Sequence, residues 1–190
     1  MRTSHPRSAV ALALAMIASA AIVLPAGAVN TVTQTVNAGT RSASIANASL
    51  GAVSYSHSAQ TSTGTLVLTA DDSSGSGEGW NVTVQTSAFV YAGSFGGTNI
   101  PASNFSLTSA SAATSTAGEP VDVVGGPRVP ATLIPPVALD AAREPLEAAL
   151  TYGEGTYTQN LGVSLGIPAQ SRVGTYTGTL TVTIAAGPGL

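Results

Sequence analysis

The sequence contains no cysteine and no lysine, and only 8% of its residues are charged. Without cysteine the chain forms no disulfide, no thiolate metal site and no lipid-modified cysteine behind a leader. Small exported domains often depend on disulfides, so this chain must rely on its apolar core instead. Its six basic residues, all arginines, face nine acidic ones, which leaves no dense positive surface. We therefore expect neither nucleic acid nor an anionic membrane surface as a partner.

The first 28 residues have the three parts of a secretory signal peptide. A short start with two arginines precedes an uncharged apolar run over residues 9–24, and Ala26 and Ala28 occupy the −3 and −1 positions of a cleavage site. The run is shorter than the roughly 18–20 residues that a membrane-spanning helix needs. We expect export, cleavage after Ala28, and a mature chain of residues 29–190 that forms one domain and makes no membrane contact.

Serine, threonine and glycine dominate the rest of the chain, and their pattern is that of β-strands. Four segments alternate between apolar residues and mainly polar ones, which is typical of a strand with one buried face. The polar face of the last segment is threonine throughout, and this β-branched residue suits the solvent side of a sheet. The four apolar faces are Leu66, Leu68 and Ala70; Trp80, Val82 and Val84; Leu161, Val163, Leu165 and Ile167; and Leu180, Val182 and Ile184. Weaker strand candidates lie at residues 31–36, 42–46, 89–92 and 105–108.

Glycine and proline divide these strands from one another. The acidic, glycine-rich residues 71–79 are typical of a hairpin loop, and residues 168–173 predict a short turn that makes the last two strands an antiparallel hairpin. The proline-rich residues 109–136 predict a long irregular insertion with one edge strand. Residues 138–152 fit a short helix or a strand, and the alternation after Pro145 favours strand. The fold class is therefore all-β, an antiparallel β-sandwich of short strands with a Pro-rich irregular insertion.

Two segments of the sequence resemble a known family. The segment GWNVTV at residues 79–84 follows the acidic loop, and GTYTGTLTVTI at residues 174–184 forms the last predicted strand. Both resemble the WxL domain, a cell-surface module of Gram-positive bacteria named for its Trp-x-Leu motif. Val82 replaces the leucine of the motif, and Val182 replaces its second tryptophan. Shorter similarities at residues 155–158 and 167–169 extend the likeness over residues 37–184.

The resemblance implies non-covalent attachment to the cell wall, with peptidoglycan as the ligand usually proposed. The sequence has no Leu-Pro-x-Thr-Gly sorting signal, so we expect a surface location to depend on contacts with wall glycan or with other surface proteins. We expect a monomer with no cofactor. The motif residues that the resemblance carries over, for which we expect a structural role, are Trp80, Val82, Tyr176, Leu180, Val182 and Ile184.

The residues that carry reaction chemistry are few. His57 is the only histidine after the leader, and no G-x-S-x-G elbow accompanies it, so we expect an exposed histidine and no enzyme. Asp71, Asp72 and Glu78 surround a Ser/Gly-rich turn and offer oxygens to Ca²⁺, but their spacing does not match an EF-hand loop. The alternative for these acids is a solvated loop without metal.

Aromatic residues supply the candidate binding groups. An exposed tryptophan stacks on sugar rings, but Trp80 shares a face with Val82 and Val84, which favours a buried indole. Tyr91 and Phe95, in a glycine-rich stretch, are better candidates for an exposed aromatic patch that binds a ligand.

A second class of function fits the same sequence. Structural subunits of pili and coats are exported sandwiches that assemble by strand exchange, and Thr31–Val36 is a candidate donated strand. Those subunits usually carry a disulfide, which this chain lacks. The sequence therefore favours a self-contained wall-binding module and leaves the assembly subunit as the alternative.

Overall fold

A computed structural model describes residues 32–188, so the predicted leader at residues 1–28 and Thr31 lie outside the described part. Residues 36–188 belong to one unit, which contains every strand named below, and residues 32–35 belong to a separate N-terminal unit. The strands are β1 (Arg41–Ile45), β2 (Gln60–Asp72), β3 (Trp80–Thr86), β4 (Val90–Ala92), β5 (Phe105–Ala110), β6 (Thr114–Gly118), β7 (Val137–Ala138), β8 (Arg143–Ala148), β9 (Gly155–Ile167), β10 (Thr175–Thr177) and β11 (Leu180–Ala186). A single 3₁₀ turn, η1 (Ala102–Asn104), precedes β5.

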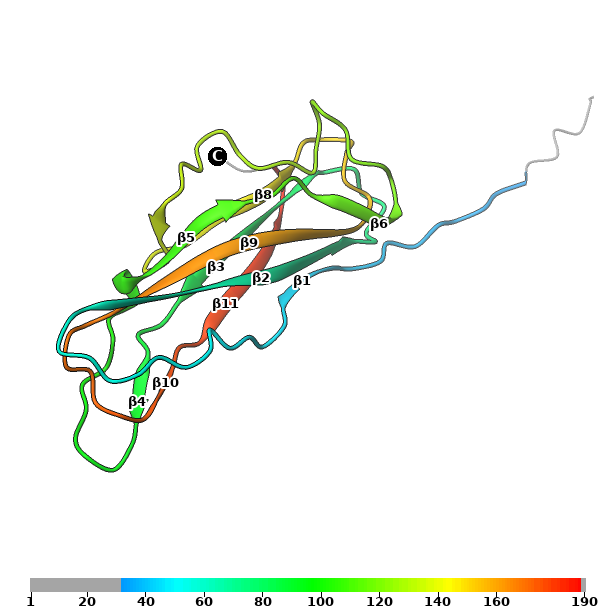
Figure 1. Cartoon of the computed structure of the whole chain (residues 1–190). Helices are drawn as coiled ribbons and strands as arrows, with labels where there is room; N and C mark the ends of the chain where they lie inside the picture. The colour runs from blue at the N-terminus through cyan, green and yellow to red at the C-terminus, as the bar shows by residue number, and fades with distance from the viewer. Residues whose placement is uncertain (1–31, 189–190) are drawn as a thin grey trace, which may run out of the picture. The chain divides into compact units, whose positions relative to one another are not determined.

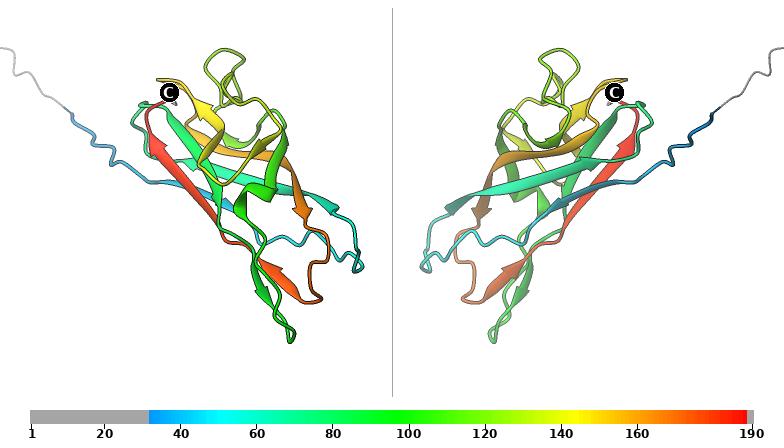
Figure 2. Two further views of the ribbon diagram at one scale, coloured as in Figure 1. Left: turned by 90° about the vertical axis from the view of Figure 1, so that its left-hand side faces the viewer. Right: turned by 90° about the vertical axis from the view of Figure 1, so that its right-hand side faces the viewer.

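The strands form two facing sheets and a small ribbon, all antiparallel (Figures 1 and 2). The larger sheet has the order β1-β2-β9-β5-β7, and β6 pairs with β9 beside β5. The smaller sheet has the order β11-β3-β8. The ribbon consists of β4 and β10, which continue the chain from β3 and into β11. The predicted all-β antiparallel sandwich is confirmed. Across residues 32–188, the structure contains no helix with the length and hydropathy of a membrane span.

The core lies between the two sheets and is built from the alternating faces of their strands. β2 and β9 pair over their full 13 residues, from Gln60 opposite Ile167 to Asp72 opposite Gly155. The apolar faces predicted for these two strands point inward, apart from the half-buried Ile167. Trp80, Val82 and Val84 of β3 meet them from the smaller sheet, and all three are buried. β3 supplies the largest side chain of the core because alternate residues of a strand share one face.

The predicted hairpin between the last two long strands is wrong. β9 lies in the larger sheet, whereas β10 pairs with β4 and β11 pairs with β3 in the smaller sheet. The segment of residues 168–174 therefore crosses from one sheet to the other. The acidic residues 71–79 do the same between β2 and β3, so the hairpin loop predicted there is also wrong. An apolar strand face is buried when it faces the opposite sheet of the sandwich. The alternation is therefore the same whether two successive strands pair in one sheet or lie in opposite sheets.

The remaining predictions concern the irregular parts of the chain. The insertion of residues 109–136 contains β6 as the expected edge strand, and a strand is confirmed around Pro145, in β8. Proline donates no backbone hydrogen bond, and β8 is suited to it because it pairs only with β3. The predicted strand at residues 31–36 is wrong for residues 32–36, which have no regular structure.

Candidate functional site

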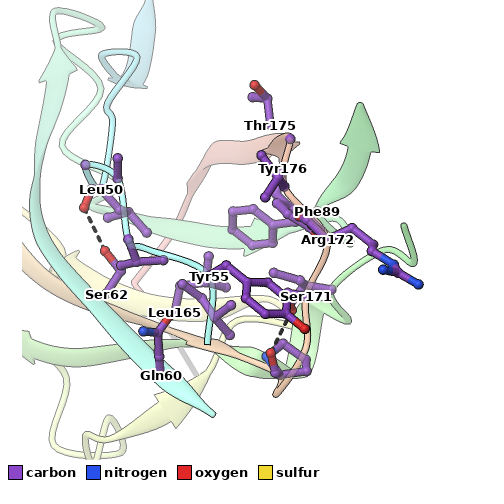
Figure 3. Close-up of a pocket in the computed structure, with 18 of the residues that line it drawn as sticks. Leu50, Tyr55, Gln60, Ser62, Phe89, Leu165, Ser171, Arg172, Thr175 and Tyr176 are labelled. Carbon is purple, nitrogen blue, oxygen red and sulfur yellow. Dashed lines mark hydrogen bonds between the residues drawn. The ribbon is translucent and has the colours of Figure 1, made fainter. Parts of the chain in front are cut away.

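A groove with a volume of about 520 Å³ opens where β2 begins and β9 ends (Figure 3). One wall is the irregular segment of residues 48–56, and the other is the crossing segment of residues 171–174 with β10. Buried and half-buried side chains line the base, among them Phe89, Ile100 and Leu165. The groove is therefore an opening toward the core at this end of the two sheets.

The segment of residues 48–56 follows the short strand β1 and runs beside the start of β2. β1 pairs only with residues 68–72 of β2, so within the described chain the outer edge of residues 60–67 has no strand beside it. The segment is held here by Ser62, whose hydroxyl donates to the Leu50 carbonyl at 2.7 Å. A side chain added at Gly64 would lie 2.7 Å from Leu50 Cδ2, so this glycine lets the segment approach β2.

The second wall is fixed by tyrosines. Tyr176 of β10 donates its hydroxyl to the Arg172 carbonyl at 2.9 Å, and Tyr91 of β4 donates to the Val173 carbonyl at 3.0 Å. The two rings pack against each other with centroids 5.3 Å apart. Because two successive carbonyls are held in this way, the backbone that carries the Arg172 side chain has a defined position.

The rim of the groove carries an exposed tyrosine. Tyr55 is 50% exposed, and its ring meets His57 edge-on at a centroid distance of 5.2 Å. The amide of Gln170 donates to the Ser56 carbonyl at 2.9 Å, which joins the two walls at this point. Figure 3 shows the Tyr55 ring directed across the groove toward Ser171. His57 is exposed, as predicted.

The aromatic residues predicted as binding groups lie beside the groove. Phe95 is 77% exposed in the segment after β4, and Tyr91 is half-buried behind Tyr176. Neither of the two lines the groove, although Tyr91 supports the Tyr176 side chain that does. Tyr55 and Arg172 were missed by the sequence analysis. The signal for Tyr55 was an aromatic residue in a segment of small polar residues.

Among residues 32–188, Arg172 is the only charged residue that lines the groove. Arg41, Arg128 and Arg143 each lie within 4.0 Å of a carboxylate, at 3.0, 3.1 and 3.9 Å respectively. Among residues 32–188, no carboxylate lies within that distance of the Arg172 guanidinium. In Figure 3 this guanidinium extends outward at the mouth of the groove, away from Leu50.

The motif residues lie in two places. Trp80 is fully buried, and its indole Nε1 donates to the Gly153 carbonyl at 2.8 Å. Val82 is buried beside it, and the ring of Tyr157 lies 6.1 Å from the indole. The three apolar residues of β11, opposite β3, are half-buried (Leu180, Val182 and Ile184). Of the six motif residues, only Tyr176 lines the groove.

The acids considered as calcium ligands are held by protein groups. Arg41 Nε lies 3.0 Å from Asp72, and Arg41 Nη1 lies 3.4 Å from Glu78. Asp71 accepts from the Thr156 hydroxyl at 2.6 Å. Burial acts to raise the pKa of Asp72, but hydrogen bonds from Ser74 and Arg41 outweigh it and lower the pKa below its ordinary value. An arginine thus supplies the positive charge at this loop, and the described residues gather no trio of His, Cys, Asp or Glu suited to a metal ion.

Comparison with known proteins gives one result. A family model described as "WxL domain surface cell wall-binding" matches residues 21–188 of the chain. The match includes the groove, the buried tryptophan and β11, and it begins within the predicted leader. No curated protein and no solved structure shows a significant match.

Proposed function

Because the chain belongs to the WxL domain surface cell wall-binding family, we propose that it attaches non-covalently to peptidoglycan through the groove at the start of β2. The family makes this protein a cell-surface domain that binds the cell wall. The choice of peptidoglycan as the ligand and of the groove as the site is our proposal. We further propose that residues 1–28 are removed on export and that residues 29–190 act as a monomer.

The observation that carries the proposal is the composition of the groove. It combines apolar and aromatic side chains with the hydroxyl groups of serines and threonines and with one arginine, a mixture that suits a ligand with both apolar and polar groups. Tyr55 is half-exposed at its rim, so one face of its ring is free to pack on a sugar or a peptide. Trp80 and Tyr157 are buried and present no ring to a ligand, whereas Phe95 is 77% exposed outside the groove.

We propose binding without a reaction. The matched family is one of binding domains. His57, the histidine available for acid–base chemistry in the described chain, packs on Tyr55, and its ring is exposed. The same ring therefore extends the aromatic rim of the groove.

Sedimentation with purified cell walls tests the proposal. The exported protein, residues 29–190, should pellet with peptidoglycan that has been stripped of proteins, and a muramidase that cuts the glycan should return it to the supernatant. A protein of similar size and charge from outside the family is the control. If residues 29–190 remain soluble with stripped walls but pellet with untreated ones, the partner is another surface molecule and the proposal fails.

One observation favours the assembly subunit as a second candidate. Val32 and Val36 are 99% and 90% exposed in a segment without regular structure, which is the condition for donating a strand to another copy. A peptide of residues 31–36 should then bind the purified protein and dissociate oligomers in light scattering. We expect a monomer that the peptide does not affect.

A further inference from the structure

We propose that the groove recognises the carboxylate-bearing stem peptide of peptidoglycan and that Arg172 binds the carboxylate. This inference rests on the proposed function and adds the part of the polymer that is recognised. Stem peptides are short, rich in alanine and end in carboxylates, whereas the glycan strand offers mainly hydroxyl and acetamido groups. The evidence is the charge of the groove, the way Arg172 is held and the unpaired edge of β2.

The charge of the groove is opposite to that of the rest of the unit. All nine acidic residues of the chain lie between positions 71 and 154, and none of them lines the groove. Asp72 and Glu154 lie at the far ends of β2 and β9. Because a strand rises about 3.3 Å per residue, those ends are roughly 40 Å from the groove. Asp140 lies instead beside Gln85, near the other end of β3, and its carboxylate is 3.9 Å from Arg143. An anion approaching this acidic protein is therefore attracted to Arg172 and repelled from the Asp72 end.

One arginine suits a single carboxylate better than a polyanion. A guanidinium forms two parallel hydrogen bonds with one carboxylate, whereas a phosphate polymer is bound by a series of cations. In the described part of the chain, Arg172 is the only cation lining the groove. A peptide carboxylate therefore matches the groove, and the polyol-phosphate polymers of Gram-positive walls do not.

Hydrogen bonds hold the backbone around Arg172 in place in the absence of ligand. Its own carbonyl accepts from Tyr176, and the next carbonyl, that of Val173, accepts from Tyr91. Ser171 Oγ donates to the Pro168 carbonyl at 2.7 Å on the other side. A fixed backbone lowers the entropy lost on binding, so Tyr176 and Tyr91 act as positioning residues for Arg172.

The opposite wall offers partners for the peptide backbone. Residues 60–67 of β2 have no strand on their outer edge within the described chain, and the segment of residues 48–56 beside them is exposed along most of its length. Of these residues, Gln60 and Ser62 line the groove, so an extended peptide in the groove would meet the edge of β2 there. The apolar base, which includes Ile100 and Leu165, suits the methyl groups of alanine.

Calorimetric titration of residues 29–190 tests the inference. The probes are a synthetic alanine-rich stem pentapeptide, its C-terminal amide, a peptide-free glycan of N-acetylglucosamine units that carries no carboxylate, and a polyol-phosphate polymer. We expect binding of the acid, with the amide and Arg172→Gln each weakening it about ten- to a hundredfold, the range for losing a charged hydrogen bond. Arg172→Lys should restore part of the loss, and Tyr176→Phe should weaken binding by a smaller factor because it removes only the hydroxyl.

Arg128→Gln is the matched control, because it changes the net charge equally at a residue outside the groove. The inference is overturned if Arg172→Gln binds the stem pentapeptide like the wild type, or if peptide-free glycan or the phosphate polymer binds more tightly. Sedimentation with whole walls separates the two proposals. If the wild type and Arg172→Gln pellet equally well, wall binding stands and the role of Arg172 fails, and if neither pellets, the proposed function itself fails.

Discussion

The two ends of the β2–β9 pair differ in how the chain closes around them. At the Asp72 end, β1 pairs with β2 and β6 pairs with β9, so both strands have neighbours on their outer sides. At the Gln60 end, β9 still pairs with β5, but β2 has only the irregular residues 48–56 beside it. The closed end holds the buried Trp80 and the ion pair of Arg41, and the open end holds the groove.

This difference separates stability from binding within one domain. At the closed end, large side chains are buried and their polar atoms are bonded, as for the Trp80 indole and for the Tyr157 hydroxyl, which donates to the Glu119 carbonyl at 2.9 Å. At the open end, Tyr55 and Arg172 are exposed. Ligand-binding segments commonly belong to the less stable parts of a domain, which have few buried apolar contacts.

The largest expected effect tests the closed end directly. Trp80→Ala should lower the free energy of unfolding by about 3–5 kcal/mol, because a fully buried indole and its hydrogen bond are lost. Urea unfolding followed by circular dichroism measures the change. Phe95→Ala, at a residue that is 77% exposed, should stay within about 0.5 kcal/mol of the wild type. Equal effects at the two positions would show that the ends do not differ.

Two glycines with similar φ values, one near each end, allow the packing at the two ends to be compared. Gly153 and Gly51 have φ values of +85° and +82°, but a side chain at Gly153 would lie 2.5 Å from Ala148 Cβ and 2.8 Å from Trp80 Nε1, whereas Gly51 faces open space. Gly51→Ala should cost about 1–2 kcal/mol for the left-handed conformation alone. Gly153→Ala should cost about 2–4 kcal/mol because overpacking is added. Thermal unfolding of the two variants measures the difference, and similar losses would contradict the tight packing around Trp80.

The ion pair of the closed end predicts a dependence on pH. The pKa of Asp72 is lower in the folded chain than its ordinary value of 3.8, so the folded state binds its proton less tightly than the unfolded state does. The stabilisation is therefore complete above pH 3.8 and is lost as the pH falls through the folded pKa. Stability should fall on acidification, because protonation removes the charge with which Asp72 accepts from Ser74 and Arg41.

Unfolding by urea between pH 2 and pH 7 measures this dependence. Asp72→Asn should be less stable than the wild type at pH 7, and its stability should fall less steeply as the solution is acidified. A curve for Asp72→Asn that runs parallel to the wild-type curve down to pH 2 would assign the acid sensitivity to other carboxylates.

The smallest expected effect on stability lies at the open end. Tyr55→Ala should change the free energy of unfolding by less than about 0.5 kcal/mol, because the ring is half-exposed and its aromatic partner His57 is itself exposed. The same variant should pellet less completely with purified walls. Lost stability with unchanged wall binding would place Tyr55 among the structural residues.

The sequence was sufficient to predict the four long strands with one apolar face, but not their partners. Alternation identified the inward faces of β2, β3 and β9 because a buried face requires an apolar residue at every second position. It did not identify which sheet each strand joins, so the predicted hairpin between β9 and the last strands was wrong. Pairing in a sandwich is set by contacts distant in sequence, and a polar turn such as residues 168–174 fits a hairpin and a crossing between sheets equally well.

The site was harder to predict than the fold, for a related reason. Trp80 was identifiable as a core residue because its neighbours on the strand face are valines. The groove is assembled from segments more than 100 residues apart in the sequence, at positions 48–56 and 171–178, and neither carries a local motif. The role proposed for Arg172 depends on the absence of a carboxylate within 4.0 Å of its guanidinium, which the sequence does not reveal because it does not place the acids in space.

The length of the β2–β9 ladder has a mechanical consequence. Hydrogen bonds between antiparallel strands lie perpendicular to the strands, so a pull along the strand direction loads many of them in shear at once, whereas a pull across the strands opens them one after another. All 13 residues of each strand are paired, between Gln60 at the groove and Asp72 at the far end. A wall contact at the groove, with drag or tension applied at the far end, therefore stresses this domain in the direction in which its longest ladder is strongest.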